Sequence, residues 1–219
     1  MPYDRSTFIV HHGFIKNKFQ KKVKVKKPEF FFYVLSSISL LLLVNCHKPD
    51  KLYSVSVKEF SNFVLETGYV TDAEKYGWSI VQETVYTYKV VNGATWHTPN
   101  GIDSTKTSMP ITQVSYNDAI AYCKWAKVKL PSYQEYWDLT NFDKKKIIKN
   151  DERIYGASEV NIIGNVWDIT TTEKGNGDIR LAGGSFLCNV NTCDGTNPNR
   201  VLYVDKTTGN INIGFSVIK

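Results

Sequence analysis

The chain has 219 residues, of which 42% are apolar and 13% aromatic, enough to bury a hydrophobic core. Its formal net charge of +6 comes from residues 1–45, which hold eight Lys and Arg against two acidic residues and leave 19 charges of each sign in the remainder. This balance argues against a basic nucleic-acid-binding surface on the folded part, and we expect no nucleic-acid partner.

The N-terminal segment has the pattern of an export signal. A basic run, KNKFQKKVKVKK, precedes 15 apolar or small residues at 30–44, whereas a membrane-spanning helix needs about 20. The residues LVNC follow and end at Cys46. This pattern resembles a bacterial lipobox, which predicts cleavage before Cys46 and lipid attachment to its thiol. The alternative is an uncleaved signal anchor.

We therefore divide the chain into a lipoprotein-type signal peptide at 1–45, a tether at 46–56 and one domain at 57–219. On this interpretation the protein is exported and lipid-anchored to a membrane of the bacterial cell envelope, in the periplasm or at the outer membrane. Cysteines can oxidise in such a compartment.

Three helices are expected in the first half of the domain. The segment VKEFSNFVLETG (57–68) has Phe60 and Phe63 at helical spacing and a stop signal at Gly68. The segments VSYNDAIAYCKWAK (114–127) and LPSYQEYWDLTNF (130–142) open with capping-box patterns, in which Ser115 precedes Asp118 and Ser132 precedes Glu135 by three residues.

The remaining segments predict loops and short strands. Residues 88–104 are rich in Gly, Asn, Pro and Ser, which indicates an irregular surface loop that Trp96 pins to the core. From Asn161 onward, short apolar runs alternate with Gly and Asn and no helical period remains. We predict an α+β fold with about three helices and a loop-rich, weakly stranded C-terminal part.

Several segments, taken in order, resemble the formylglycine-generating enzyme family, also called the sulfatase-modifying factor family. They are FVLETGYVTDAEKYGWS (63–79), GATWHTPNGIDS (93–104), the long run from MPITQ to YQEYW (109–137), NIIGNVWDI (161–169), LAGGSFLC (181–188) and, loosely, TGNINIGFSV (208–217). The resemblance implies an irregular, C-type-lectin-related fold stabilised by calcium. For active members it also implies oxidation of a cysteine in a protein substrate, such as a sulfatase, to Cα-formylglycine with molecular oxygen.

The stretch GGSFLCNVNTC (183–193) carries the pattern that binds Cu(I) in active members of the family. On that resemblance Cys188 and Cys193 are the copper ligands and catalytic residues, and Ser185 is the helper hydroxyl. Two soft thiolates suit Cu(I) and leave room for a substrate thiolate. A disulfide between the two cysteines is the alternative, and an oxidised pair can also be a resting form.

The stretch NIIGNVWD has a separate interpretation. In the family it wraps a calcium ion, so Asn161 and Asp168 would supply side-chain oxygens and Gly164 and Val166 would supply carbonyls. Asp168 replaces the usual Glu, and its shorter side chain reaches less far toward a bound calcium ion. The alternative is a structural turn that enters a buried Trp167.

The remaining candidate residues are Cys123 and two histidines. Cys123 falls on the apolar face of the second expected helix and is predicted to be a core residue. Beyond the signal segment only His47 and His97 remain, too few for the histidine-ligated iron of sulfoxide synthases, a sister branch of this fold, or for a serine triad.

Departures from the family pattern keep two functions open. The Gly-rich opening strand is missing or reduced to LYSVSVKEF, and the segment for a second calcium site is absent. After Cys193 only Arg200 lies near the usual arginine position, and GFSV lacks the arginine of Gly-Phe-Arg. The first hypothesis is a copper-dependent formylglycine-generating oxidase. The second is a catalytically silent cell-envelope lipoprotein that uses the fold as an interaction module.

Overall fold

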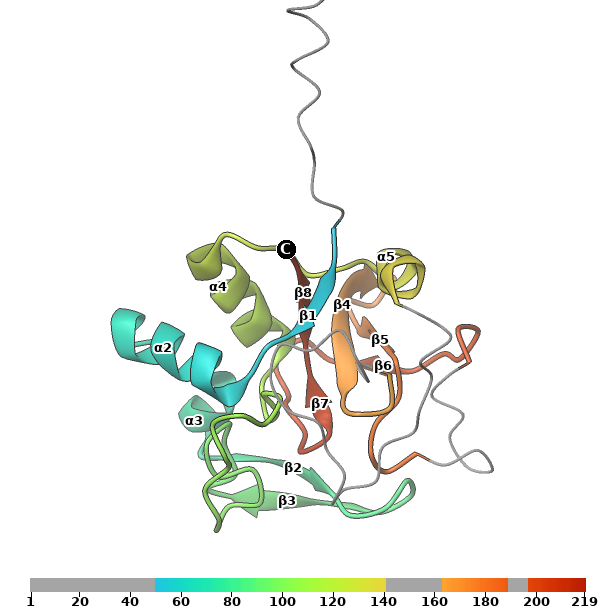
Figure 1. Ribbon diagram of the computed structural model, residues 1–219. Helices are drawn as coiled ribbons and strands as arrows, with labels where there is room; N and C mark the ends of the chain where they lie inside the picture. The colour runs from blue at the N-terminus through green and yellow to red at the C-terminus, as the bar shows by residue number, and fades with distance from the viewer. Residues whose placement is uncertain (1–49, 141–162, 189–196) are drawn as a thin grey trace, which may run out of the picture. The chain divides into compact units, whose positions relative to one another are not determined.

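The computed structural model describes residues 50–140, 163–188 and 197–219 (Figure 1). The expected signal peptide at 1–45 and the lipidation site at Cys46 lie outside these residues, as do Asn161 and Cys193. The chain divides into two units, and only the second, Pro49–Lys219, contains described residues. Within the described residues, no helix has both the length and the apolar character needed to cross a bilayer.

The three expected helices are present, and each begins at a serine that caps it. They are α2 (Val57–Thr67) after Ser56, α4 (Tyr116–Ala126) after Ser115 and α5 (Tyr133–Leu139) after Ser132. In each, the N-cap hydroxyl accepts from the backbone N–H three residues on, whose acidic side chain accepts from the N-cap N–H. Gly68 ends α2 in the left-handed conformation, as the sequence predicts.

A further short helix, α3 (Asp72–Tyr76), is not among the predicted elements. Its five residues give only one turn, too short for a hydrophobic period to be visible. The local signals are nevertheless in the sequence, because Thr71 and Glu74 form a capping box and Gly77 closes the helix at φ 75°.

The strands form two antiparallel pairs and one four-stranded sheet among the described residues. The first pair is β1 (Leu52–Ser54) with β8 (Ser216–Ile218), and the second is the hairpin of β2 (Trp78–Gln82) and β3 (Tyr88–Asn92). The sheet has the order β6 (Tyr203–Val204), β5 (Ile179–Ala182), β4 (Trp167–Glu173) and β7 (Ile213–Gly214), with β4 and β7 parallel. This mixture confirms the α+β prediction.

Two of these strands differ from the sequence analysis. β1 lies inside the expected tether at 46–56, where Leu52 is buried because it pairs with Ile218 at the far end of the chain. β3 lies at the start of the segment at 88–104, so the prediction of an irregular loop is wrong for these residues. Pairing with β2 makes them a strand in spite of the loop-like composition that follows.

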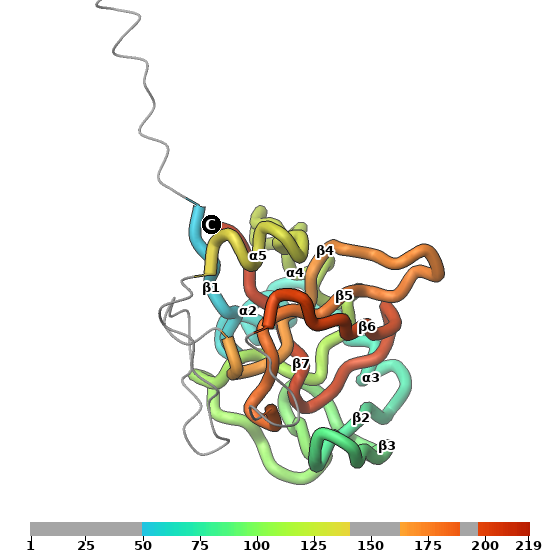
Figure 2. Tube along the Cα trace, turned by 90° about the vertical axis from the view of Figure 1, so that its right-hand side faces the viewer, coloured from blue at the N-terminus to red at the C-terminus, as the bar shows by residue number. Residues whose placement is uncertain are grey.

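The main core is an aromatic cluster between the helices and the C-terminal strands. The Phe60 ring stacks on Tyr122 at 6.0 Å and meets Trp96 and Phe215 edge-on at 5.6 and 6.4 Å. Trp96 is 7% exposed, which confirms its role as the anchor of the loop. In the ribbon of Figure 1 and the Cα tube of Figure 2, the β2–β3 hairpin lies at the opposite end of this unit from α4 and α5.

Candidate functional site

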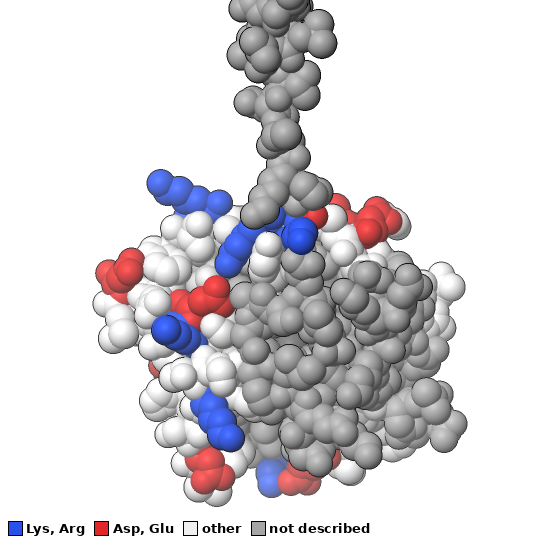
Figure 3. All heavy atoms as spheres, viewed as in Figure 1, with Lys and Arg blue, Asp and Glu red and all other residues white. Residues whose placement is uncertain are grey.

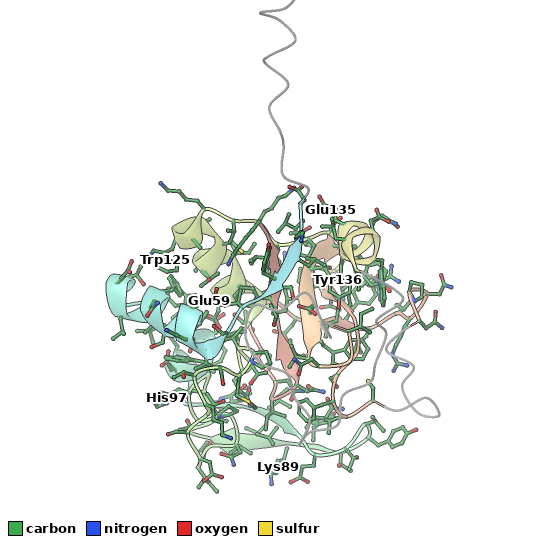
Figure 4. All side chains as sticks on the ribbon, viewed as in Figure 1. Glu59, Lys89, His97, Trp125, Glu135 and Tyr136 are labelled. Carbon is green, nitrogen blue, oxygen red and sulfur yellow. The ribbon has the colours of Figure 1, made fainter. Side chains whose placement is uncertain are left out.

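The turn after β5 sets up the candidate site. Gly183 and Gly184 have φ of 86° and 77°, which glycine adopts readily. A Cβ at Gly183 would collide with the hydroxyl of Tyr136, which points from α5 toward β4 (Figure 4). This close approach lets the chain turn from the sheet directly into Ser185 and Cys188.

Ser185 and Cys188 lie against each other across this turn. The backbone N–H of Ser185 donates to Sγ of Cys188 at 3.4 Å, and Oγ of Ser185 lies 4.0 Å from the same sulfur. The N–H of Cys188 donates to the carbonyl of Ser185 at 2.9 Å. Their exposed fractions are 0% and 4%, so the structure buries together two residues that the family pattern pairs.

A cavity of about 320 Å³ adjoins both residues. Leu181, Leu202 and Ile213 give it an apolar wall, and Trp167 lies in the same lining. Tyr86 and Tyr88, which are 76% and 72% exposed, also line it and therefore mark its outer rim. The volume falls at the lower end of the range of about 300–1,000 Å³ for small-molecule sites, enough for a side chain of a bound peptide.

Side-chain amides hold the Ser185 hydroxyl in place at the cavity wall. Nδ2 of Asn212 donates to Oγ of Ser185 at 3.2 Å and to Oε1 of Gln82 at 3.0 Å. The N–H of Gln82 in turn donates to Oδ1 of Asn210 at 3.2 Å. Because Leu187 N–H also donates to Oγ of Ser185 at 3.4 Å, the hydroxyl accepts two bonds and its own proton is left to point elsewhere.

Arg200 supplies the positive charge of the cavity. Its guanidinium carbon lies 5.7 Å from the centre of the Trp167 ring, and both residues line the cavity. The described lining contains no Asp or Glu. A negatively charged group that enters would therefore meet one cation and no anion among these residues.

The cysteines of the described region are in different states. Cys188 is disulfide-bonded, and Cys123 is free and buried. Burial raises the pKa of Cys123 to about 12, as expected for a core thiol, and this confirms its predicted role. A disulfide sulfur carries no thiolate charge for Cu(I), so the copper and disulfide alternatives are two redox states of Cys188 that differ by electrons and protons.

Three of the expected calcium residues are described, and one of them is a buried carboxylate. Gly164 lies in a turn with φ 83°, Val166 is buried, and the Asp168 side chain on β4 is 1% exposed. Burial raises the pKa of Asp168 to about 7, although the hydroxyls of Ser216 and Tyr136 lie beside it. Oδ1 of Asp168 and both hydroxyls have no partner with good hydrogen-bond geometry among the described residues, so the two hydroxyls only lie near the carboxylate.

This carboxylate fits a cation site in part. Among the described residues, no Lys or Arg shifts its pKa, so no described cation compensates its charge when it is ionised. The described residues contain no group of three or more His, Cys, Asp or Glu suited to a metal, so a calcium site here would need main-chain carbonyls and donors outside them, such as Asn161. Trp167 is also buried, as the structural-turn alternative requires.

His97 lies away from the cavity. It is exposed on the loop after β3, and its ring meets Trp96 at 5.3 Å (Figure 4). On the described part of the face in Figure 3, acidic and basic side chains are interspersed, in keeping with the neutral composition of this part of the chain.

Several cavity residues are absent from the sequence analysis. Gln82, Tyr86 and Tyr88 carry no recognisable motif, because they come from a hairpin about a hundred residues before Cys188. Asn212 lies within the segment at 208–217 that loosely matches the family, so the match could have marked it as a candidate residue. Its hydrogen bond to Ser185 could not be predicted from that match.

The sulfatase-modifying factor enzyme 1-like domain matches residues 51–139. Formylglycine-generating enzymes from Bos taurus and Thermomonospora curvata are 41% and 40% identical to 103- and 106-residue stretches, which cover 38% and 40% of this chain. These matches make residues 51–139 similar to the sulfatase-modifying factor family. These stretches span only 28% and 34% of the two relatives' own lengths.

A longer but weaker match within this family is to an inactive member. The inactive Cα-formylglycine-generating enzyme 2 of Bos taurus is 28% identical over 205 residues, which cover 68% of this chain and 67% of that protein. Among solved structures, the crystal structure of CarF aligns with a TM-score of 0.45 at 13% identity, over 76% of this chain and 84% of that one. No property of this chain is inferred from so distant a likeness.

Proposed function

We propose that this protein is a copper-dependent oxidase that converts a cysteine of a polypeptide substrate to Cα-formylglycine. The observation that carries the proposal is the shared position of Cys188 and Ser185 on one cavity wall, within reach of a group that enters past Tyr86 and Tyr88. Sulfatases are the substrate class that the resemblance suggests.

The reaction requires Cys188 in its reduced form. Overall, the thiol-bearing carbon of a substrate cysteine and one molecule of oxygen, with two electrons and two protons from a thiol reductant, give an aldehyde, hydrogen sulfide and water. Copper, when bound by the thiolates of Cys188 and Cys193, would supply the activation of oxygen. The chain's own residues would orient the substrate: Ser185 through its fixed hydroxyl, and the apolar wall by excluding water.

Calcium has a structural role in the same proposal. The buried Asp168 carboxylate, with the carbonyls of Gly164 and Val166 and the side chain of Asn161, would bind Ca²⁺ and neutralise the charge next to α5. Hard oxygen donors distinguish this site from the soft sulfur donors of the copper site.

The decisive experiment uses the reduced full chain with Cu(I), oxygen, a thiol reductant and a peptide containing one cysteine. Mass spectrometry should find the mass decrease that accompanies conversion of the cysteine side chain to an aldehyde. Cys188→Ser should abolish both copper binding and conversion, whereas Cys123→Ser, its matched control outside the cavity, should retain them. Failure of the wild-type chain to bind Cu(I) after full reduction would refute the proposal.

A second function is favoured by one observation. The match that covers two thirds of both chains is to an inactive family member, although its identity is lower. On this alternative the domain serves as an interaction module of the cell envelope, and its cysteines have no catalytic use. Cells that carry Cys188→Ser, with the variant folded and present at normal amounts, should then be indistinguishable from wild type. A phenotype equal to gene deletion would argue for the oxidase.

We also propose that the protein is exported and anchored through a lipid on Cys46, on the basis of the lipobox-like LVNC. Labelling of cells with a fatty-acid analogue should modify the wild-type protein and leave Cys46→Ser unmodified. An unlabelled wild-type protein of full mass would favour the uncleaved signal anchor.

A further inference from the structure

The β2–β3 hairpin has one strand edge that pairs with no described strand. On the other side of the hairpin, β2 is covered, because Ile80 bridges Asn210 and its carbonyl accepts from Ile211 N–H at 3.2 Å. β3 pairs with β2 alone in the two-stranded sheet. Within the described part of the chain the outer edge of β3 is therefore open at Tyr88 and Val90, whereas Gly101 packs against its far end at Asn92.

The register shows which main-chain groups point to that edge. Glu83 N–H donates to Thr87 O at 2.9 Å and Gly93 N–H donates to Gly77 O at 2.9 Å, so these pairs are hydrogen-bonded across the hairpin. In an antiparallel ladder such pairs alternate with pairs that are not bonded. Tyr88 and Val90, opposite Gln82 and Ile80, fall in the non-bonded positions, and their N–H and C=O groups face outward.

The same two residues expose apolar side chains. Tyr88 is 72% and Val90 61% exposed, and they share a face of the hairpin because residues two apart point to the same side. The intervening Lys89 points to the other face and is bound to Glu83 at 2.6 Å (Figure 4). Charged residues commonly protect strand edges from pairing, and here the charge is turned to the opposite face from Tyr88 and Val90.

This edge is continuous with the cavity at Cys188. Tyr88 both begins the open edge and lines the cavity, next to Tyr86 and Gln82. A bound polypeptide with one side chain in the cavity would leave the cavity past Tyr86 and Tyr88. From there, an extended segment would run along Val90 with its backbone opposite unpaired donors and acceptors.

We propose that the outer edge of β3 docks the polypeptide substrate as an added strand, with the reacting cysteine in the cavity and apolar side chains over Tyr88 and Val90. The inference rests on the proposed function, because it takes the occupant to be a cysteine-containing polypeptide. Main-chain hydrogen bonds would give affinity that depends little on the substrate's sequence. The side chains of Tyr88 and Val90 would select apolar substrate residues at alternate positions.

The test separates main-chain pairing from side-chain contact. Val90→Pro removes an outward N–H without removing a bond to β2, since proline is tolerated at strand edges. Tyr88→Ser removes apolar contact and keeps the backbone. The probe is a fluorescent peptide with apolar residues at alternate positions and serine in place of its cysteine, so that binding is measured by anisotropy without chemistry.

Each variant should weaken binding about 3- to 10-fold, the effect of one net hydrogen bond or a comparable contact. Leu65→Ser, which alters a residue on α2 that is 78% exposed, is the matched control and should bind as wild type does. A peptide in which an alkene isostere replaces the peptide bond whose carbonyl faces Val90 N–H should bind wild type and Val90→Pro equally weakly, because both changes remove the same bond.

Two outcomes would overturn the inference. Unchanged binding by both folded variants would do so, and so would self-association of the wild-type chain that Val90→Pro abolishes while peptide binding persists, because the edge would then belong to a second copy. Binding with the predicted pattern but without conversion of a cysteine-containing peptide would refute the oxidase and retain the docking edge.

Discussion

At the scale of single residues, two cysteines of similar burial differ in what surrounds them. Cys123 is 6% exposed among apolar side chains of α4, and Cys188 is 4% exposed but lines the cavity beside Ser185. The helical position of Cys123 predicts its core role from the sequence. The redox state of Cys188 could not be predicted in that way, because the family pattern fits both a thiolate and a disulfide.

We predict that Cys123 resists alkylation in the native protein. With a pKa of about 12, only about one molecule in ten thousand carries the reactive thiolate at pH 8. After mild reduction, iodoacetamide should leave Cys123 unmodified until denaturant is added, as measured by peptide mass spectrometry. Modification in native buffer at the rate of a free thiol would show that the helix opens readily.

At the scale of elements, hydrogen bonds link the N-termini of α3 and α4, in addition to the capping box within each helix. Ser115, the N-cap of α4, donates its hydroxyl proton to Asp72 of α3 at 2.7 Å. Asp118 of α4 accepts from the backbone N–H of Asp72 at 3.1 Å and from the Tyr69 hydroxyl at 2.9 Å. The capping boxes are visible in the sequence, whereas the link between them depends on a separation of more than 40 residues.

Ser115→Ala should therefore cost more stability than Ser132→Ala. Loss of an N-cap costs about 1 kcal/mol, and Ser115→Ala also removes a hydroxyl donor from the buried Asp72, which adds about 1–3 kcal/mol. Ser132 donates no comparable bond to another helix in the described part of the chain, so it serves as the matched control. Urea denaturation of both variants measures the difference, and equal losses would mean that the link between α3 and α4 contributes nothing.

At the scale of the whole domain, one buried carboxylate joins the sheet to α5 and β8. Asp168 on β4 lies beside Tyr136 of α5 and Ser216 of β8. Its folded-state pKa of about 7 lies above the ordinary value of about 3.9. Without a cation, its contribution to stability is fully present below about pH 4 and is lost as pH rises through about 7.

Calcium should reverse that loss at neutral pH. At a concentration near one hundred times its Kd, bound Ca²⁺ adds about 2.7 kcal/mol to the free energy of unfolding, which raises Tm by about 5–10 °C. Asp168→Asn should lose this increase and should be at least as stable as the calcium-free wild type at pH 8. Thermal unfolding with EDTA and with Ca²⁺ measures both, and an equal Tm in the two buffers would exclude the site.

The sequence by itself determined three of the four described helices, because their capping boxes and apolar spacing are local. The family segments pointed to Ser185 and Cys188 as the centre of the proposed site. Tertiary structure alone decided the rest. β1 needs β8, the Ser185 hydroxyl is held by Asn212, and Asn212 meets Gln82 across 130 residues. Such partners leave no local pattern, since only the closed fold brings them within hydrogen-bond distance.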